Sequence, residues 1–299
     1  MDPYIVIAGL GIGLLVGMTG MGGASLMTPL LILFFGVEPV TAIGTDLFYG
    51  AITKTAGAWR HLKHGTVHRG IAFWLAIGSV PSAIAGVFVI EYLQNNYGED
   101  QVKNLVLGMV GAALLVVGVA TLLRAFFLTK QIPDRYALHL YPRHIFAAIA
   151  TGLVTGFVIG LTSAGSGTLI AISLILIYRL TPQRVVGTDI FHAAVLLWAA
   201  GIAHWIGGNV DFGLAANILV GSIPGVLVGS SLAVRAPQAF LRPALGVVLC
   251  ASSVTLLVKY GTANVVIPAL AVATLVIGSL LIAQVMLNRQ YRARRAPAT

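Results

Sequence analysis

The sequence predicts an all-α polytopic membrane protein made of two inverted repeats of about five hydrophobic segments each, plus one C-terminal helix. Of the 299 residues, 58% are hydrophobic and only 9% are charged, and the mean hydropathy is +0.94. A soluble domain carries about 25% charged residues, so this chain has too few polar side chains to cover a surface that faces water. Segments that cross a bilayer account for this composition.

Charge and cysteine content exclude several classes of function. The formal net charge is +9, but the basic residues lie in short loops and near the C-terminal end, where the excess of positive charge in cytoplasmic loops explains them. We therefore expect a lipid bilayer, and no nucleic acid, as the partner of this chain. The single cysteine, Cys250, excludes an intrachain disulfide, and no residue cluster predicts a metal or another cofactor.

An internal repeat organises the chain. Residues 160–229 match residues 17–86 with an offset of 143 and no gap, and 23 of the 70 paired positions are identical. The tripeptide Gly44-Thr45-Asp46, for example, returns as Gly187-Thr188-Asp189. Paired repeats with broken hydrophobic segments are typical of transporters whose substrate site lies between the two halves.

The apolar runs divide into two sets of five and one extra run. We expect a first transmembrane repeat over 1–127, a cytoplasmic linker over 128–143, a second transmembrane repeat over 144–258, and an extra helix with a basic cytoplasmic tail over 259–299. The first run lacks the features of a cleaved signal peptide, so we expect it to stay as a membrane segment. The runs are 3–19, 24–36, 39–60, 70–92, 102–126, 144–162, 166–179, 182–206, 211–234, 238–258 and 263–287.

The placement of Lys and Arg predicts that the repeats are inverted. The loop at 60–64 and the linker are basic, whereas the loop between them, at 91–100, is acidic. The second-repeat loop at 205–212, equivalent to the first basic loop, contains Asp211 and no Lys or Arg. Equivalent loops would thus lie on opposite faces of the cell inner membrane, with the C-terminus in the cytoplasm. A tandem repeat of one orientation is the alternative.

The first two runs of each repeat are short for a bilayer span of about 20 residues, and small residues separate them. We expect each pair to form a broken or re-entrant hairpin with a glycine-rich tip. Because a helix follows each tip, N–H groups and hydroxyls there would bind an anion. The alternative is that small residues only allow close helix packing. The candidate substrate-binding residues are Thr19, Gly20, Gly22, Gly23 and Ser25 in the first tip and Thr162, Ser163, Gly165, Ser166 and Thr168 in the second.

Two aspartates, Asp46 and Asp189, lie about two turns into equivalent predicted helices. A carboxylate that faces lipid costs about 2.5–3.5 kcal/mol, so we expect both to face the protein interior. They either take up a coupling proton or sodium ion, or organise the site by accepting hydrogen bonds from a tip. Thr45 and Thr188, which precede them, belong to the same candidate group.

Lys54 follows Asp46 by eight residues and has no counterpart in the second repeat, where Leu197 stands. A buried ammonium group needs a partner, which would be Asp46 or the substrate anion. The alternative is that Lys54 extends toward the cytoplasmic end of its helix.

Three histidines complete the set of candidate polar groups. His192 lies three residues after Asp189 and shares its helix face, so it could tune that carboxylate. His61 and His204 end equivalent helices near opposite surfaces, which favours roles as caps or anchors over proton transfer.

The ordered motifs resemble the sulfite exporter TauE/SafE family of membrane permeases over about residues 5–258. This chain differs from many relatives, which have Ser where it has Asp46 and Asp189. The resemblance implies a cell-membrane carrier of sulfur-containing anions such as sulfite or small sulfonates, with the substrate at the glycine-rich tips. The motifs are Gly20-Met-Gly-Gly-Ala-Ser-Leu-Met-Thr-Pro29, Pro39-x-x-Ala42-x-Gly44-Thr45-Asp46, the turn from His61 to Gly65 with Val67, and Gly78-Ser79-x-Pro81, followed by their repeat.

These observations predict a secondary transporter that moves a small sulfur-containing anion by alternating access, and not an enzyme. No nucleotide-binding loop is present, so we do not expect ATP to drive this chain directly. The alternatives are an anion channel and an intramembrane hydrolase that would use Ser25 or Ser166 with a histidine. The predicted place of His61 and His204 at helix ends disfavours the hydrolase.

Overall fold

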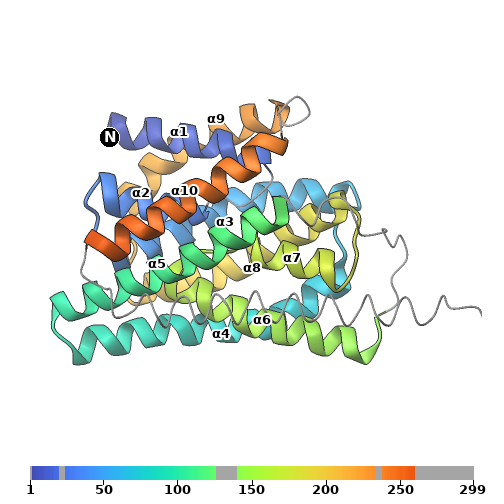
Figure 1. The fold of residues 1–299 in the computed structure, drawn as a ribbon, viewed down its shortest axis with the longest axis horizontal. Coiled ribbons are helices and arrows are strands. Elements are labelled where there is room, and N and C mark those ends of the chain that lie inside the picture. The colour runs from blue at the N-terminus through green and yellow to red at the C-terminus, as the bar shows by residue number, and fades with distance from the viewer. Residues whose placement is uncertain (1, 20–23, 126–139, 233–237, 260–299) are drawn as a thin grey trace, which may run out of the picture.

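The computed structural model describes residues 2–19, 24–125, 140–232 and 238–259, which form ten α-helices and no β-strand (Figure 1). The predicted all-α class is therefore confirmed, and each apolar run up to residue 258 corresponds to one helix. The run at 263–287 lies outside the described residues. The helices are α1 (Pro3–Thr19), α2 (Ala24–Phe34), α3 (Pro39–Lys63), α4 (Arg69–Asn96), α5 (Glu99–Leu123), α6 (Pro142–Thr162), α7 (Leu169–Leu176), α8 (Pro182–Ile206), α9 (Phe212–Leu232) and α10 (Gln238–Lys259).

Local sequence signals set the start of the two central helices, α3 and α8. Pro39 and Pro182 occupy their first turns, where the N–H group that proline lacks would have no helical partner in any case. Glu38 caps α3 by accepting hydrogen bonds from the N–H group and the hydroxyl of Thr41, at 2.8 and 3.1 Å. Asp46 and Asp189 each follow the first residue of their helix by seven positions, so the aspartates of the two repeats lie at the same distance from the helix start.

Helix contacts in one repeat recur in the other. α1 lies along α9, and their equivalents α6 and α4 lie along each other, whereas α3 packs on α8 and α5 on α10 (Figure 1). Two hydrogen bonds between the repeats recur in the same way. The hydroxyl of Thr45 accepts from the N–H group of Asp211 at 3.0 Å, and that of Thr188 accepts from the N–H group of His68 at 2.9 Å. The two acceptors are separated by the repeat offset (188 − 45 = 143), and so are the two donors (211 − 68 = 143). Each repeat therefore makes the same contact to the other, so the repeats are related by pseudo-twofold symmetry.

Glycines bring the backbones of α1 and α9, and those of α4 and α6, into direct contact. A Cβ atom added to these glycines would lie closer to the facing backbone than real side chains approach. Along both pairs the contacts advance by four residues on each helix, so α1 runs parallel to α9 and α6 parallel to α4. The contacts are Gly9 with Ile218, Gly13 with Ser222, Gly17 with Val226, Gly152 with Leu75, Gly156 with Ser79 and Gly160 with Ala83.

The equivalent helices α3 and α8 run antiparallel. Gly50 faces Leu197 and Gly57 faces Ile190, so residue numbers rise along one helix as they fall along the other. The pseudo-twofold axis therefore crosses these helices and does not run along them. The same holds for α5 and α10, where the facing pairs are Gly111 with Leu257 and Gly118 with Cys250.

Among the described residues, five helices, α4, α5, α6, α8 and α9, are long and apolar enough to cross a membrane by length and composition. α1, α2 and α10 contain shorter apolar stretches. α3 is also long but carries Asp46 and Lys54, and the fold buries both side chains. The helix faces that point outward are apolar, as a lipid environment requires, with Phe73, Phe146 and Leu227 each more than half exposed.

Candidate functional site

The second tip, residues 162–168, is buried throughout. Its backbone leaves the helical path at Ser163, with φ of 58°, and at Gly165, with φ of 102°, a value that favours glycine. The hydroxyl of Thr162 accepts a hydrogen bond from the N–H group of Ala164 at 3.2 Å, and the hydroxyls of Thr168 and Thr121 lie 3.2 Å apart. Gly165 thus forms the turn itself, whereas the glycines of α1, α4, α6 and α9 permit close helix packing.

The two tips contact each other through their described residues. Ser25, in the first turn of α2, is buried, and its Oγ atom accepts a hydrogen bond from the N–H group of Gly165 at 2.9 Å. Thr19 ends α1. The other candidates in the first tip, Gly20, Gly22 and Gly23, lie outside the described residues.

Asp46 is fully buried and connects the second tip to the first repeat. Its Oδ2 atom accepts hydrogen bonds from the hydroxyl of Ser163, at 2.8 Å, and from the hydroxyl of Thr28 in α2. The carboxylate therefore contacts the tip through hydroxyl donors. Thr28 was not a sequence candidate, although its place one turn after Ser25 puts both on one face of α2.

Asp189 has a different environment from Asp46. It is 2% exposed, and neither of its oxygens receives a hydrogen bond within the described part of the chain. The position equivalent to Thr28 is Ala171 (28 + 143 = 171), which has no hydroxyl to donate. The two aspartates are thus equivalent in the repeat but differ in what they contact.

Lys54 reaches the second tip from α3. Its side chain is 8% exposed, and Nζ donates to the carbonyl oxygen of Ser166 at 3.1 Å and to its hydroxyl at 2.9 Å. Lys54 therefore does not extend to the surface, and its hydrogen-bond partners are neutral groups of the other repeat. An ammonium group has three N–H donors, so one is left beyond those that Ser166 takes. A buried charge of this kind stabilises an anion bound beside it.

The histidines contact neutral groups and not the candidate serines. The Nε2 atom of His192 and the hydroxyl of Ser79 in α4 lie 2.8 Å apart. His61 is hydrogen-bonded to the hydroxyl of Thr66 at 2.9 Å, and the Nε2 atom of His204 lies 3.1 Å from a backbone oxygen in α6. The hydroxyls of the serines at 25 and 166 are instead bonded to a tip N–H group and to Lys54.

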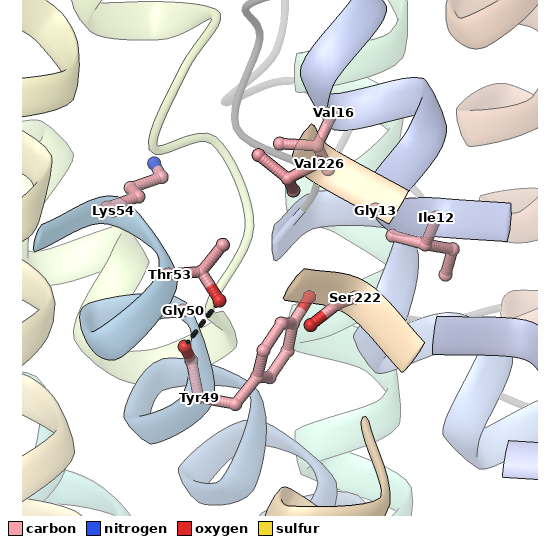
Figure 2. A pocket seen from close by; sticks show the side chains of 9 residues that line it. All are labelled: Ile12, Gly13, Val16, Tyr49, Gly50, Thr53, Lys54, Ser222 and Val226. Carbon is pink, nitrogen blue, oxygen red and sulfur yellow. Dashed lines mark hydrogen bonds between the residues drawn. The ribbon is translucent and has the colours of Figure 1, made fainter. Parts of the chain in front are cut away.

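A pocket lies between α1, α3 and α9, and Figure 2 shows the side chains that line it. Its cavity volume is about 20 Å³, and the cavity is open on one side. Lys54 belongs both to this pocket and to the contact with the second tip. The lining residues are Ile12, Gly13, Val16, Tyr49, Gly50, Thr53, Lys54, Ser222 and Val226.

Comparison with known proteins places this arrangement in a family. The family model for the sulfite exporter TauE/SafE matches residues 5–256, from α1 into α10. The chain belongs to the sulfite exporter TauE/SafE family. The family assignment covers both repeats, and with them Asp46, Asp189 and both tips.

Relatives of this TauE/SafE protein are named as transporters. The probable membrane transporter protein YjnA of Bacillus subtilis (strain 168) is 42% identical over 237 residues, which are 79% of this chain and 91% of the relative. The probable membrane transporter protein YdhB of the same organism is 29% identical over 78% of this chain and 91% of the relative. The sulfite exporter TauE/SafE family protein 2 of Arabidopsis thaliana is 30% identical over 105 residues, 35% of this chain and 23% of its own. No solved structure matches this TauE/SafE chain significantly. The protein is a membrane transporter of this family.

Proposed function

We propose that the protein is a secondary transporter of a small sulfur-containing anion, sulfite or a sulfonate, which binds beside Lys54 at the second tip. The observation that carries the proposal is the contact of the Lys54 ammonium group with Ser166, in a buried setting where both of its partners are neutral. Positive charge attracts the anion, and tip hydroxyls supply further donors. The name of the family supports sulfite as a member of the substrate class.

The directions of the helices support inverted repeats and alternating access. In a bilayer, antiparallel α3 and α8 would place equivalent loops on opposite faces, in agreement with the positions of the charged residues. The linker at 128–143 and the C-terminus would then face the cytoplasm across the inner membrane. The two repeats, 1–127 and 144–258, would move against each other about a site between the tips.

The two aspartates would divide their roles. Asp46, held by the hydroxyls of Ser163 and Thr28, would organise the site by positioning the second tip. Asp189, whose oxygens have no hydrogen-bond donor among the described residues, would take up the coupling proton or sodium ion. No group of three or more His, Cys, Asp or Glu side chains in the described chain could hold a metal ion.

Uptake by proteoliposomes tests the transport proposal. Purified protein should take up radiolabelled sulfite or a labelled sulfonate in a saturable manner that responds to pH or to a sodium gradient. Absence of transport of sulfite, sulfonates and sulfate under every gradient would contradict the proposal. Uptake that neither saturates nor responds to a second ion would identify a channel instead.

Variants at the tip test the site. Lys54→Met keeps the length of the side chain but removes its charge, so uptake should fall by about tenfold or more. Ser166→Leu should also block uptake, because its bulk fills the space beside the ammonium group. The matched control is Lys103→Met, which removes a charge from the exposed face of α5 and should leave uptake unchanged. Normal uptake by both tip variants would overturn the site assignment.

A further inference from the structure

The pocket between α1, α3 and α9 is open, whereas the equivalent region of the other repeat is closed. In the pocket, Val16, Thr53 and Val226 are only half-buried. Every equivalent position, reached by adding or subtracting 143, is buried, and there Ser79 and His192 are hydrogen-bonded at 2.8 Å. The equivalent positions are Thr155, Gly156, Ile159, His192, Ala193, Leu196, Leu197, Ser79 and Ala83.

The open pocket also contains a hydroxyl without a partner. Ser222, which corresponds to Ser79, is 1% exposed, and its Oγ atom has no hydrogen-bond partner among the described residues. Figure 2 shows this hydroxyl and that of Tyr49, the counterpart of His192, directed toward the same part of the pocket. A buried hydroxyl without a partner costs free energy, which a bound acceptor would recover.

The composition of the lining favours an anion. Lys54 is its only ionisable residue besides Tyr49, and no carboxylate is among the nine lining residues. The remaining lining is aliphatic apart from the hydroxyls of Tyr49, Thr53 and Ser222. A few placed polar groups in a mostly apolar wall are typical of a small-molecule site.

We propose that this pocket binds a small oxyanion with one negative charge, such as a short sulfonate, on its way to the second tip. Ser222 would donate a hydrogen bond to one of its oxygens, and Lys54 would supply the charge. The Ser79–His192 hydrogen bond would keep the equivalent route in the other repeat closed, so the structure is open to one side only. This inference rests on the proposed function, because it describes how the transported anion reaches Lys54.

Cysteine reactivity tests the pocket directly. Cys250→Ala gives a background without cysteine, in which Thr53→Cys and Leu196→Cys place one thiol at equivalent positions of the open and the closed region. The probe is 2-sulfonatoethyl methanethiosulfonate, a small anionic thiol reagent, applied to the full-length protein in detergent. The thiol at position 53 should react at least about tenfold faster than that at position 196. Equal rates, or no reaction at position 53, would overturn the proposal of a one-sided pocket.

Protection by an anion tests the ligand class. Methanesulfonate, at constant ionic strength set with gluconate, should slow the reaction at Thr53→Cys by about threefold or more, a change of roughly 0.7 kcal/mol. Adding Lys54→Met or Ser222→Ala should remove the protection, whereas Ser173→Ala, which removes a buried hydroxyl bonded to Ile170 within α7, should leave it intact. Protection that persists in both the Lys54 and Ser222 variants would refute the anion site. A monodisperse elution profile for each variant shows that it is folded.

The outcomes separate this inference from the proposed function. Protection at position 53 by methanesulfonate, in a protein that transports no sulfur-containing anion, would support the pocket and reject the transport proposal. Uptake of sulfite or sulfonate without any protection at position 53 would support the transport proposal and reject the pocket.

Discussion

Ser163 donates its hydroxyl hydrogen to the Oδ2 atom of Asp46 at 2.8 Å and thereby joins the tip of the second repeat to the central helix of the first. Thr28 donates to the same oxygen from α2. Three segments, α2, α3 and the second tip, therefore meet at one buried carboxyl group. Movement of either repeat relative to the other has to break or rearrange this contact.

Ser163→Ala should destabilise the protein by about 1–3 kcal/mol, because it removes one donor to a buried carboxyl group. The measurement is unfolding in mixed micelles of increasing denaturing detergent. Ser173→Ala is the matched control. It removes a buried hydroxyl that bonds only the carbonyl of Ile170 within α7, at 2.7 Å. If Ser163→Ala loses no more stability than the control does, this contact has no role in joining the repeats.

The Asp189→Asn variant should lose the dependence of uptake on pH or sodium and keep most of its stability, because no hydrogen bond to Asp189 is broken. Asp46→Asn should instead lower stability, since a neutral amide oxygen accepts weaker hydrogen bonds from Ser163 and Thr28 than a carboxylate oxygen does. Uptake in proteoliposomes over a range of pH, with and without sodium, measures the first effect. An unchanged profile for Asp189→Asn would assign this residue a structural role.

Much of the fold follows from local features of the sequence. The length of each apolar run predicts a helix, proline and capping residues fix where α3 begins, and the cost of exposing a charge to lipid predicts the burial of Asp46 and Asp189. The repeat offset then predicts which contacts should occur twice, as the hydrogen bonds of Thr45 and Thr188 do.

Side-chain pairing within the site does not follow from the sequence. Ser163 and Asp46 are 117 residues apart, and Lys54 and Ser166 are 112 apart, so only the packed fold brings them together. Helical spacing suggested that His192 faces Asp189, but its hydrogen-bond partner is on α4. The close approach of the glycine-rich helices determines which side chains meet, because it brings whole backbone faces into contact.

Labelling of engineered cysteines should show that equivalent loops lie on opposite faces of the membrane. In a Cys250→Ala background, Lys63→Cys and Ile206→Cys place thiols at equivalent exposed positions (63 + 143 = 206) at the ends of α3 and α8. A maleimide that cannot cross membranes should label position 206 in right-side-out vesicles and position 63 in inverted vesicles. Labelling of both positions from one side would contradict the inverted repeat.

Gly9→Ala should destabilise the contact between α1 and α9. An added Cβ atom would lie 2.7 Å from the carbonyl oxygen of Ile218, and overpacking of this kind costs about 1–3 kcal/mol. Alanine favours a helix over glycine by about 1 kcal/mol, so the net loss of stability is the difference between the two effects.

Gly11→Ala, two residues further along the same helix, is the control. Its Cβ would meet nothing within 4 Å, so this variant should be at least as stable as the parent. Unfolding of both variants in mixed micelles measures the difference. Equal stability of the two would show that α1 can shift on α9 without cost, and the close backbone contact would then not hold these helices together.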